Sequence, residues 1–341
     1  MKILYSNEAN FKDEFRALVD RSNIDMQSVM PIVNGIINDI KERGDAALNE
    51  QIAKFDKWEV NGNLAITTDE MKAAYDNLDD KLRNALKLAY ERIKAYHEKQ
   101  VEKSWIDFEP SGAILGQKVT PVDRAGLYIP GGKAAYPSSL IMNAVPAIVA
   151  GVKEIVVCTP AVGGEVNSLL LAAMHLLGIK TAYKVGGASA VAAMAYGTQT
   201  IKKVDVITGP GNIFVATAKK MVYGDVNIDM IAGPSEIGVI ADESANPTHI
   251  AIDLLSQAEH DEIASSFLIT FSAEFANKVN DEIQRLLPNL KRYEIAKASI
   301  DNKAAIIVAR DIDECIELMN ALAVEHLEIA TDNAYEYLPR I

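Results

Sequence analysis

Cysteine, basic residues and long hydrophobic runs are all scarce in this sequence, and each scarcity argues against a class of protein. Only Cys158 and Cys315 occur, both in apolar surroundings, so we expect buried thiols in a reducing compartment rather than a disulfide framework. Lys and Arg total 34 against 47 Asp and Glu, and the net charge of −13 argues against nucleic acid as a partner. Together with a start that lacks the apolar core of a signal peptide, this composition predicts a cytoplasmic protein.

The apolar segments are too short to cross a membrane. A spanning helix needs about 18 consecutive apolar residues, and the best candidate, residues 140–150, contains Asn143 and Pro146. With 341 residues, 49% of them hydrophobic, the chain is long enough for two domains that each have a core. We therefore predict a globular protein with no membrane partner.

The chain divides into a helical part and two series of alternating strands and helices. Residues 8–103 are mostly helical in pattern, and apolar side chains from Met71 to Ile93 recur at the spacing of one long helix. Later, apolar runs alternate with helical segments, which is typical of parallel βαβ units with both sheet faces covered. The expected strands are 125–129, 155–159, 181–185, 204–208 and 227–231 in the first series, and 237–241, 267–271, 304–308 and 327–330 in the second.

Four glycine-containing turns are expected where strands end. Ligands of open parallel sheets bind beyond the carboxyl ends of the strands, and glycine lets backbone N–H groups approach an anion there. Each turn alone is also explained as an ordinary connection, but four in succession favour one shared cleft. None has the G-x-G-x-x-G fingerprint of ordinary dinucleotide binding. The turns are Pro130-Gly131-Gly132, Gly186-Gly187, Gly209-Pro210-Gly211-Asn212 and Gly233-Pro234-Ser235.

Two short segments carry side chains suited to catalysis. Gln257 and His260 are spaced to share a helix face, but glutamine is a poor zinc ligand, so a capped helix end with a buried histidine is the alternative. Glu325 and His326 are adjacent, and an imidazole titrates near neutral pH while a carboxylate orients it or activates water. A charged connector is the alternative here. Adjacent strand residues face opposite ways, so the pair serves one site only in a bend.

Taken together, these segments resemble histidinol dehydrogenases in order and approximate spacing, over nearly all of the chain. The resemblance implies an α/β fold of two related, incomplete Rossmann-like domains with parallel sheets, the second inserted in the first, and an N-terminal helical part. It places residues 1–127 and 233–341 in the first domain and 128–232 in an inserted NAD-binding domain. The matching segments are 125–132, 209–212, 232–236, 254–260 and 325–327.

The resemblance also implies an activity, which is the two-step oxidation of L-histidinol through L-histidinaldehyde to L-histidine by a homodimer that uses NAD and zinc. By matching position, Glu325 and His326 correspond to the family's acid/base pair, and Gln257 and His260 to zinc ligands. The implied substrate contacts are Ser235, Gln257, His260 and His326. The implied NAD contacts are Tyr128, Asn212 and the position of Ser189, where the family usually has glutamine.

Family chains continue beyond the position of Ile341, and their further residues supply an Asp and a His for zinc. The resemblance therefore implies that the C-terminal tail is absent here. Gln257 and His260 fill two of about four zinc positions, so we expect an incomplete zinc site. A non-catalytic or weakly active fragment that keeps the nucleotide cleft is the alternative to an active dehydrogenase.

Overall fold

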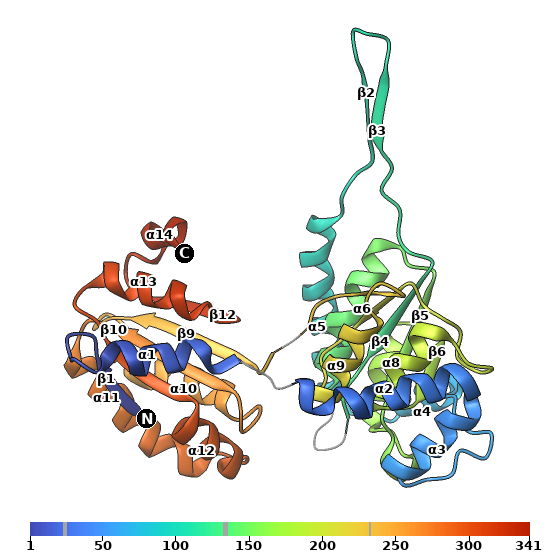
Figure 1. Ribbon diagram of the computed structural model, residues 1–341, viewed down its shortest axis with the longest axis horizontal. Coiled ribbons are helices and arrows are strands. Elements are labelled where there is room, and N and C mark those ends of the chain that lie inside the picture. The colour runs from blue at the N-terminus through green and yellow to red at the C-terminus, as the bar shows by residue number, and fades with distance from the viewer. Residues whose placement is uncertain (23–25, 132–135, 232) are drawn as a thin grey trace. The chain divides into compact units, whose positions relative to one another are not determined.

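The structure is a computed structural model that describes residues 1–22, 26–131, 136–231 and 233–341, and it divides into two compact units (Figure 1). Unit 1 comprises Met1–Ile24 and Gly233–Ile341, and unit 2 comprises Asp25–Ala232, so unit 2 is inserted in unit 1. Gly132 and Ala232, which belong to two of the motifs above, lie outside the described residues. No helix of the described ranges is both long and apolar enough to span a membrane.

The secondary structure alternates between helices and strands after an initial helical part. The helices of unit 1 are α1 (Phe11–Val19), α10 (Pro247–Ala258), α11 (Ala273–Leu286), α12 (Tyr293–Asn302), α13 (Ile312–Leu322) and α14 (Ala334–Tyr337), and those of unit 2 are α2 (Met26–Arg43), α3 (Asp45–Phe55), α4 (Thr68–Asp76), α5 (Asp80–His97), α6 (Pro137–Ala150), α7 (Ser168–Leu176), α8 (Gly187–Tyr196) and α9 (Ile213–Val222). The strands of unit 1 are β1 (Lys2–Tyr5), β9 (Glu236–Ala241), β10 (Ser265–Thr270), β11 (Ala304–Val308) and β12 (His326–Ala330), and those of unit 2 are β2 (Trp105–Phe108), β3 (Ile114–Gln117), β4 (Arg124–Tyr128), β5 (Glu154–Thr159), β6 (Thr181–Lys184), β7 (Val206–Thr208) and β8 (Asn227–Ile228).

Unit 2 is built on a parallel sheet of strand order β6-β5-β4-β7-β8. The first three strands count outward to one side and the next two to the other, as in Rossmann-like sheets. Helices α2, α3, α8 and α9 form a core on one face, around Val33 and Val191. Helices α4 to α7 form a core on the other, around Leu140 and Leu170. Because both faces are covered, the strands read as continuous apolar runs.

Unit 1 repeats this arrangement with strand order β1-β11-β10-β9-β12. The segment β11-β10-β9-β12 has the same order and direction as β6-β5-β4-β7 of unit 2. Helices α10 to α12 pack on one face, around Leu254 and Phe275, and α1 and α13 pack on the other, around Phe11 and Cys315. This confirms the predicted fold class of two related α/β units, one inserted in the other. Cys158 and Cys315 are buried free thiols, as expected.

The division into units differs from the predicted domain limits in one respect. Residues 1–127 were expected to accompany 233–341, whereas α2 to α5 belong to unit 2. The reason is that α2 buries Val33 and Ile37 in the same core as α8 and α9. An amphipathic helix has an apolar face whichever sheet it covers, so its sequence pattern does not say which of two sheets that will be.

The prediction of one long helix over residues 71–93 is also wrong, because the structure has two helices there, α4 and α5. Helix α4 ends at Asp76, and Asp79 caps α5 by accepting a hydrogen bond from the Leu82 N–H at 2.9 Å. Met71 of α4 and Leu86 of α5 lie in the same core. The apolar spacing therefore continues across the break, because both helices turn their apolar sides to one surface.

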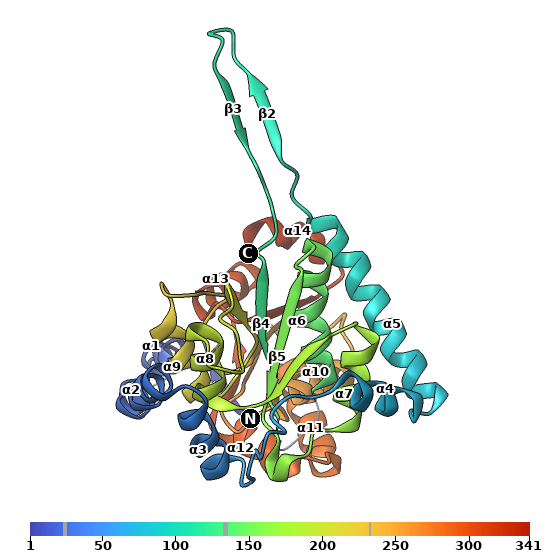
Figure 2. The ribbon, with the colours of Figure 1, turned by 90° about the vertical axis from the view of Figure 1, so that its right-hand side faces the viewer.

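An antiparallel hairpin of β2 and β3, not predicted from the sequence, projects away from the rest of unit 2 (Figures 1 and 2). The register pairs Phe108 with Ile114 and Ile106 with Gly116, which puts these residues on one face. Ile106, Phe108 and Ile114 are 68%, 73% and 65% exposed. An exposed apolar patch of this kind marks a surface for interaction.

Candidate functional site

Unit 2 contains a cavity of about 510 Å³ at the carboxyl ends of its strands. Tyr128 ends β4, Gly186 and Gly187 follow β6, and Asn212 follows β7. Strands β4 and β7 are neighbours at the point where the strand order reverses, which is where open α/β sheets bind their ligands. Tyr128, Ser189 and Asn212, the three residues singled out as NAD contacts, all line this cavity.

Asn212 is the N-cap of α9. Its Oδ1 accepts hydrogen bonds from the N–H groups of Phe214 at 3.1 Å and Val215 at 3.2 Å. The side-chain amide NH₂ makes no hydrogen bond to any other residue that the structure describes. A helix N-terminus carries partial positive charge and free N–H groups. This end of the cavity can therefore bind an anion or a polar group of a ligand.

Tyr128 connects two elements of the cavity wall. Its side chain is buried, and its hydroxyl oxygen accepts a hydrogen bond from the Gly187 N–H at 3.2 Å, at the start of α8. Burial raises the pKa of Tyr128 to about 12. The phenol therefore stays neutral at physiological pH, and its O–H remains available as a donor.

The opposite wall comes from α2 and α3, whose part in the site the sequence reasoning missed. Gln51, Phe55 and Asp56 line the cavity. Gln51 Oε1 is buried and has no hydrogen-bond partner among the described residues. Burial raises the pKa of the Asp56 carboxyl, although the backbone of Ala161 donates a hydrogen bond to it. A cavity lined by an amide side chain, a carboxyl group and the N-cap of a helix suits a ligand that carries both hydroxyl and anionic groups, as a nucleotide does.

A second group of candidate residues lies in unit 1, at the amino ends of its strands. Ser235 immediately precedes β9, Glu325 immediately precedes β12, and His326 is the first residue of β12, paired with Ile237. The turn Gly233-Pro234-Ser235 was expected at a carboxyl end with the other three, and this expectation is wrong because the turn leads into β9. His260 lies in the connection to β10, the neighbour of β9, so it also approaches the amino edge.

Glu325 and His326 approach each other closely although they are adjacent in sequence. Glu325 Oε2 lies 3.7 Å from His326 Nε2, and the two side chains are 53% and 60% exposed. Glu325 stands outside the strand, so the alternation of strand side chains does not separate the pair. An exposed carboxylate beside an imidazole can act as a general acid/base pair.

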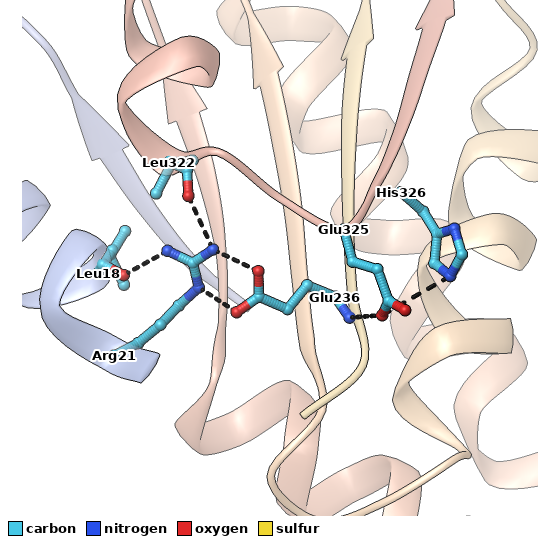
Figure 3. Close-up of polar contacts among 6 residues, drawn as sticks. All are labelled: Leu18, Arg21, Glu236, Leu322, Glu325 and His326. Carbon is cyan, nitrogen blue, oxygen red and sulfur yellow. Dashed lines mark hydrogen bonds and ion pairs between the residues drawn. The ribbon is translucent and has the colours of Figure 1, made fainter. Parts of the chain in front are cut away.

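A buried ion pair holds this edge of the sheet (Figure 3). Arg21 donates to both carboxylate oxygens of Glu236, at 2.9 and 2.6 Å, and to the carbonyl oxygens of Leu18 and Leu322, both at 2.9 Å. The Glu236 N–H in turn donates to Glu325 Oε2 at 3.4 Å. A bidentate arginine fixes the geometry of the carboxylate that it binds. The Glu236 backbone thus gives Glu325 a fixed contact point.

Gln257 and His260 do not share a helix face as expected. Gln257 is buried in the last turn of α10, which ends at Ala258, and His260 is exposed in the following turn, its N–H donating to the Gln257 carbonyl oxygen at 3.1 Å. The chain leaves the helix there in order to enter β10. In the part of the chain that the structure describes, no group of three or more His, Cys, Asp or Glu residues could hold a metal ion. A zinc site needs at least three protein ligands, so these residues do not complete one.

Comparison with known proteins gives consistent results. The family model for histidinol dehydrogenase matches residues 19–341. The histidinol dehydrogenase of Sulfurimonas denitrificans is 62% identical, over 98% of this chain and 79% of its own length. That of Wolinella succinogenes is 60% identical, over 100% of this chain and 79% of its own length. The crystal structure of histidinol dehydrogenase from Elizabethkingia anophelis matches with a TM-score of 0.94 and 36% identity, covering 100% of this chain and 78% of that one.

Proposed function

Because the chain belongs to the histidinol dehydrogenase family, we propose that it is an NAD-dependent oxidoreductase that converts L-histidinol, by way of L-histidinaldehyde, to L-histidine in histidine biosynthesis. The observation that carries this proposal is the cavity of unit 2, because Tyr128, Ser189 and Asn212 all line it. The family of the relatives supports L-histidinol as the substrate, and the cavity supports the binding of a nucleotide.

NAD, when bound, supplies the hydride acceptor. We propose that its polar groups are held by the positive N-terminal end of α9, the Asn212 amide NH₂ and the Tyr128 hydroxyl. Gln51, whose side chain lines the cavity and whose Oε1 lacks a partner among the described residues, is a further proposed polar contact. Ser189 is buried on α8 and contributes a shorter polar side chain than glutamine.

The proposed proton chemistry belongs to Glu325 and His326. In the first oxidation His326 takes the hydroxyl proton of histidinol as hydride leaves the carbon. The aldehyde must then add water before it can lose a second hydride. Glu325 takes a proton from that water and then from the hydrate, and its contact with the Glu236 N–H keeps the carboxylate in place. The exposure of both side chains allows protons to exchange with solvent.

Ser235, Gln257, His260 and His326 are the proposed substrate contacts, and Gln257 and His260 are the proposed donors to zinc. Two donors are too few for a stable zinc site, so no step is assigned to the metal. We expect zinc bound to this 341-residue chain to be lost on dialysis, because zinc affinity depends on a complete set of ligands. Stoichiometric zinc that remains after dialysis, measured by atomic emission, would contradict this expectation.

The decisive test is NADH formation that depends on L-histidinol, measured by fluorescence with and without added zinc. Histidinol-dependent NADH would support the dehydrogenase. NAD binding in calorimetry without turnover would instead favour the alternative of a weakly active or non-catalytic chain that keeps the nucleotide cleft.

A homodimer and a cytoplasmic location, both implied by the family resemblance, complete the proposal. The exposed apolar face of the β2–β3 hairpin is the feature that supports association between copies. Light scattering should give twice the chain mass. Phe108→Ser with Ile114→Ser should reduce that mass if the hairpin takes part, and a wild-type monomer would contradict the dimer.

A further inference from the structure

A buried lysine that pairs with a part-exposed aspartate lies in unit 2, outside the residues that line the cavity. Lys219 on α9 is 2% exposed, and its ammonium pairs with the carboxylate of Asp229, just after β8. A lysine buried this deeply loses its hydration, which is unfavourable unless a partner charge and hydrogen bonds replace the water. Neither residue lines the cavity, so the pair does not itself contact a ligand there.

Both members of the pair hold the same residue, Gly209. Lys219 Nζ donates to the Gly209 carbonyl oxygen at 2.9 Å, and the Gly209 N–H donates to Asp229 Oδ2 at 2.9 Å. The two side chains also bind each other. The peptide groups on either side of Gly209 therefore cannot rotate without breaking a charge-assisted hydrogen bond.

Gly209 sets the turn into α9. Its φ is +119°, and a Cβ atom there would lie 2.0 Å from the carbonyl oxygen of Tyr128. Three residues later, Asn212 caps α9 and lines the cavity. The conformation of residues 209–212 therefore decides where the Asn212 amide and the first N–H groups of α9 point.

We propose that Lys219 and Asp229 are positioning residues for the nucleotide, because they hold residues 209–212 in the conformation that presents the N-terminus of α9 to the cavity. This inference rests on the proposed function, since it takes NAD as the ligand. A ligand that binds only one conformation loses apparent affinity in proportion to the fraction of protein in that conformation. By keeping that fraction high, the pair strengthens binding without touching the ligand.

Two measurements on one set of variants test the proposal. Lys219→Met removes the ammonium, and Lys220→Met removes the adjacent exposed lysine of the same helix as a matched control. In Lys219→Met we expect amide hydrogen exchange of residues 209–215 to be about tenfold faster without cofactor, and the Kd for NAD by calorimetry to be about tenfold higher. Lys220→Met should match the wild type in both.

Each other result overturns part of the proposal. Unchanged exchange in Lys219→Met would show that the pair does not hold the turn. Faster exchange with unchanged NAD affinity would show that the pair holds the turn but does not affect NAD binding. Absence of NAD binding in the wild type would refute the proposed cofactor site, and this inference with it, whatever the exchange shows.

A second variant covers the possibility that Lys219→Met does not fold. Asp229→Asn keeps the size of the side chain and an oxygen for the Gly209 N–H, but removes the charge that attracts Lys219. It should give the same faster exchange and weaker NAD binding. If Lys219→Met folds, adding it to Asp229→Asn should weaken binding little further, because both changes break one unit. Fully additive effects on NAD affinity would show that Lys219 and Asp229 act independently, which would contradict the proposal.

Discussion

The two units share the order of four parallel strands, yet their candidate residues lie at opposite edges of their sheets. In unit 2 they gather at the carboxyl ends of β4 and β7, around a cavity. In unit 1 the corresponding strands are β9 and β12, and the candidate acid/base pair lies at their amino ends, exposed to solvent. The comparison shows that a fold offers positions for a site, while the loops decide which of them is used.

The turns at the carboxyl edges explain part of the difference. In unit 2 these turns contain glycine, which lets helix N-termini approach a ligand. In unit 1 the turn after β9 begins with Asp242 and Glu243, and that after β12 contains Asp332, with no glycine in either. Asp242 also accepts a hydrogen bond at 2.9 Å from the N–H of Ser244, a residue of the same turn. Acidic turns repel phosphate, so the carboxyl edge of unit 1 is less suited to a nucleotide than that of unit 2.

Removing the imidazole at the amino edge should have the largest effect and separate the two regions. His326→Asn should slow NADH formation from both histidinol and histidinaldehyde about 10²–10⁴-fold, because a general base is lost. Its affinity for NAD should not change, since His326 is not among the residues that line the proposed cofactor cavity. Single-turnover fluorescence measures the rate of NADH formation, and calorimetry measures the affinity for NAD. Weaker NAD binding would contradict the proposal that unit 2 binds the cofactor and unit 1 carries the acid/base pair.

The same single-turnover assay distinguishes the role of Glu325 from that of His326. Glu325→Gln keeps the shape of the side chain and removes its basicity. It should therefore slow oxidation of supplied histidinaldehyde more than oxidation of histidinol. Equal slowing of both substrates, or of neither, would refute the separate roles proposed for Glu325 and His326.

A glycine substitution in each unit should sharpen the contrast between a tightly built turn and an open one. Gly209→Ala places a Cβ atom 2.0 Å from the Tyr128 carbonyl oxygen at a φ of +119°. We expect it to lower the free energy of unfolding by about 3 kcal/mol or more and to abolish NAD binding. Gly233→Ala meets nothing within 4 Å, and should change neither urea unfolding nor NAD binding. Equal effects would mean that the turn of unit 2 is not the constrained one.

Two helix caps provide the next comparison. Asn212 caps α9 beside the cavity, and Asn246 caps α10 of unit 1 by accepting a hydrogen bond from the Thr248 N–H at 2.9 Å. Changing either to alanine should cost about 1 kcal/mol of stability. Only Asn212→Ala should also weaken NAD binding, by about tenfold if one hydrogen bond to the ligand is lost. Unchanged NAD affinity in calorimetry would rule out this placement.

The smallest expected effect concerns a carboxyl group of β12. Burial, and then the neighbouring Asp253, raises the pKa of Glu328. A carboxyl with a raised pKa in the folded state loses stabilisation as pH rises from its unfolded value, near 4.5, through its folded one. Glu328→Gln should therefore raise the stability at pH 7, by less than about 1 kcal/mol for a part-exposed group. The gain should vanish near pH 4, and a gain that persists there would exclude ionisation as its cause.

The sequence predicted most of the sheet but less of the site. The strands of both series were found because their apolar runs are long and bounded by turns. Gln51 and Asp56 were missed because nothing local distinguishes a helix residue facing a cavity from one facing a core. The β2–β3 hairpin was missed because a solvent-exposed strand is expected to carry polar side chains on its exposed face. Ile106 and Phe108 are exposed but apolar.

By itself, the sequence determined the α/β fold class, because apolar periodicity and turn residues act over a few neighbouring positions, and it indicated the family through the resemblance of its motifs to those of histidinol dehydrogenases. Only the tertiary structure decided that α2 and α3 close the cavity of unit 2, that the candidate residues of unit 1 lie at the amino edge, and that Lys219 and Asp229 meet at Gly209. These results depend on contacts between residues far apart in sequence. Such contacts are set by how whole elements pack, and no local pattern records them.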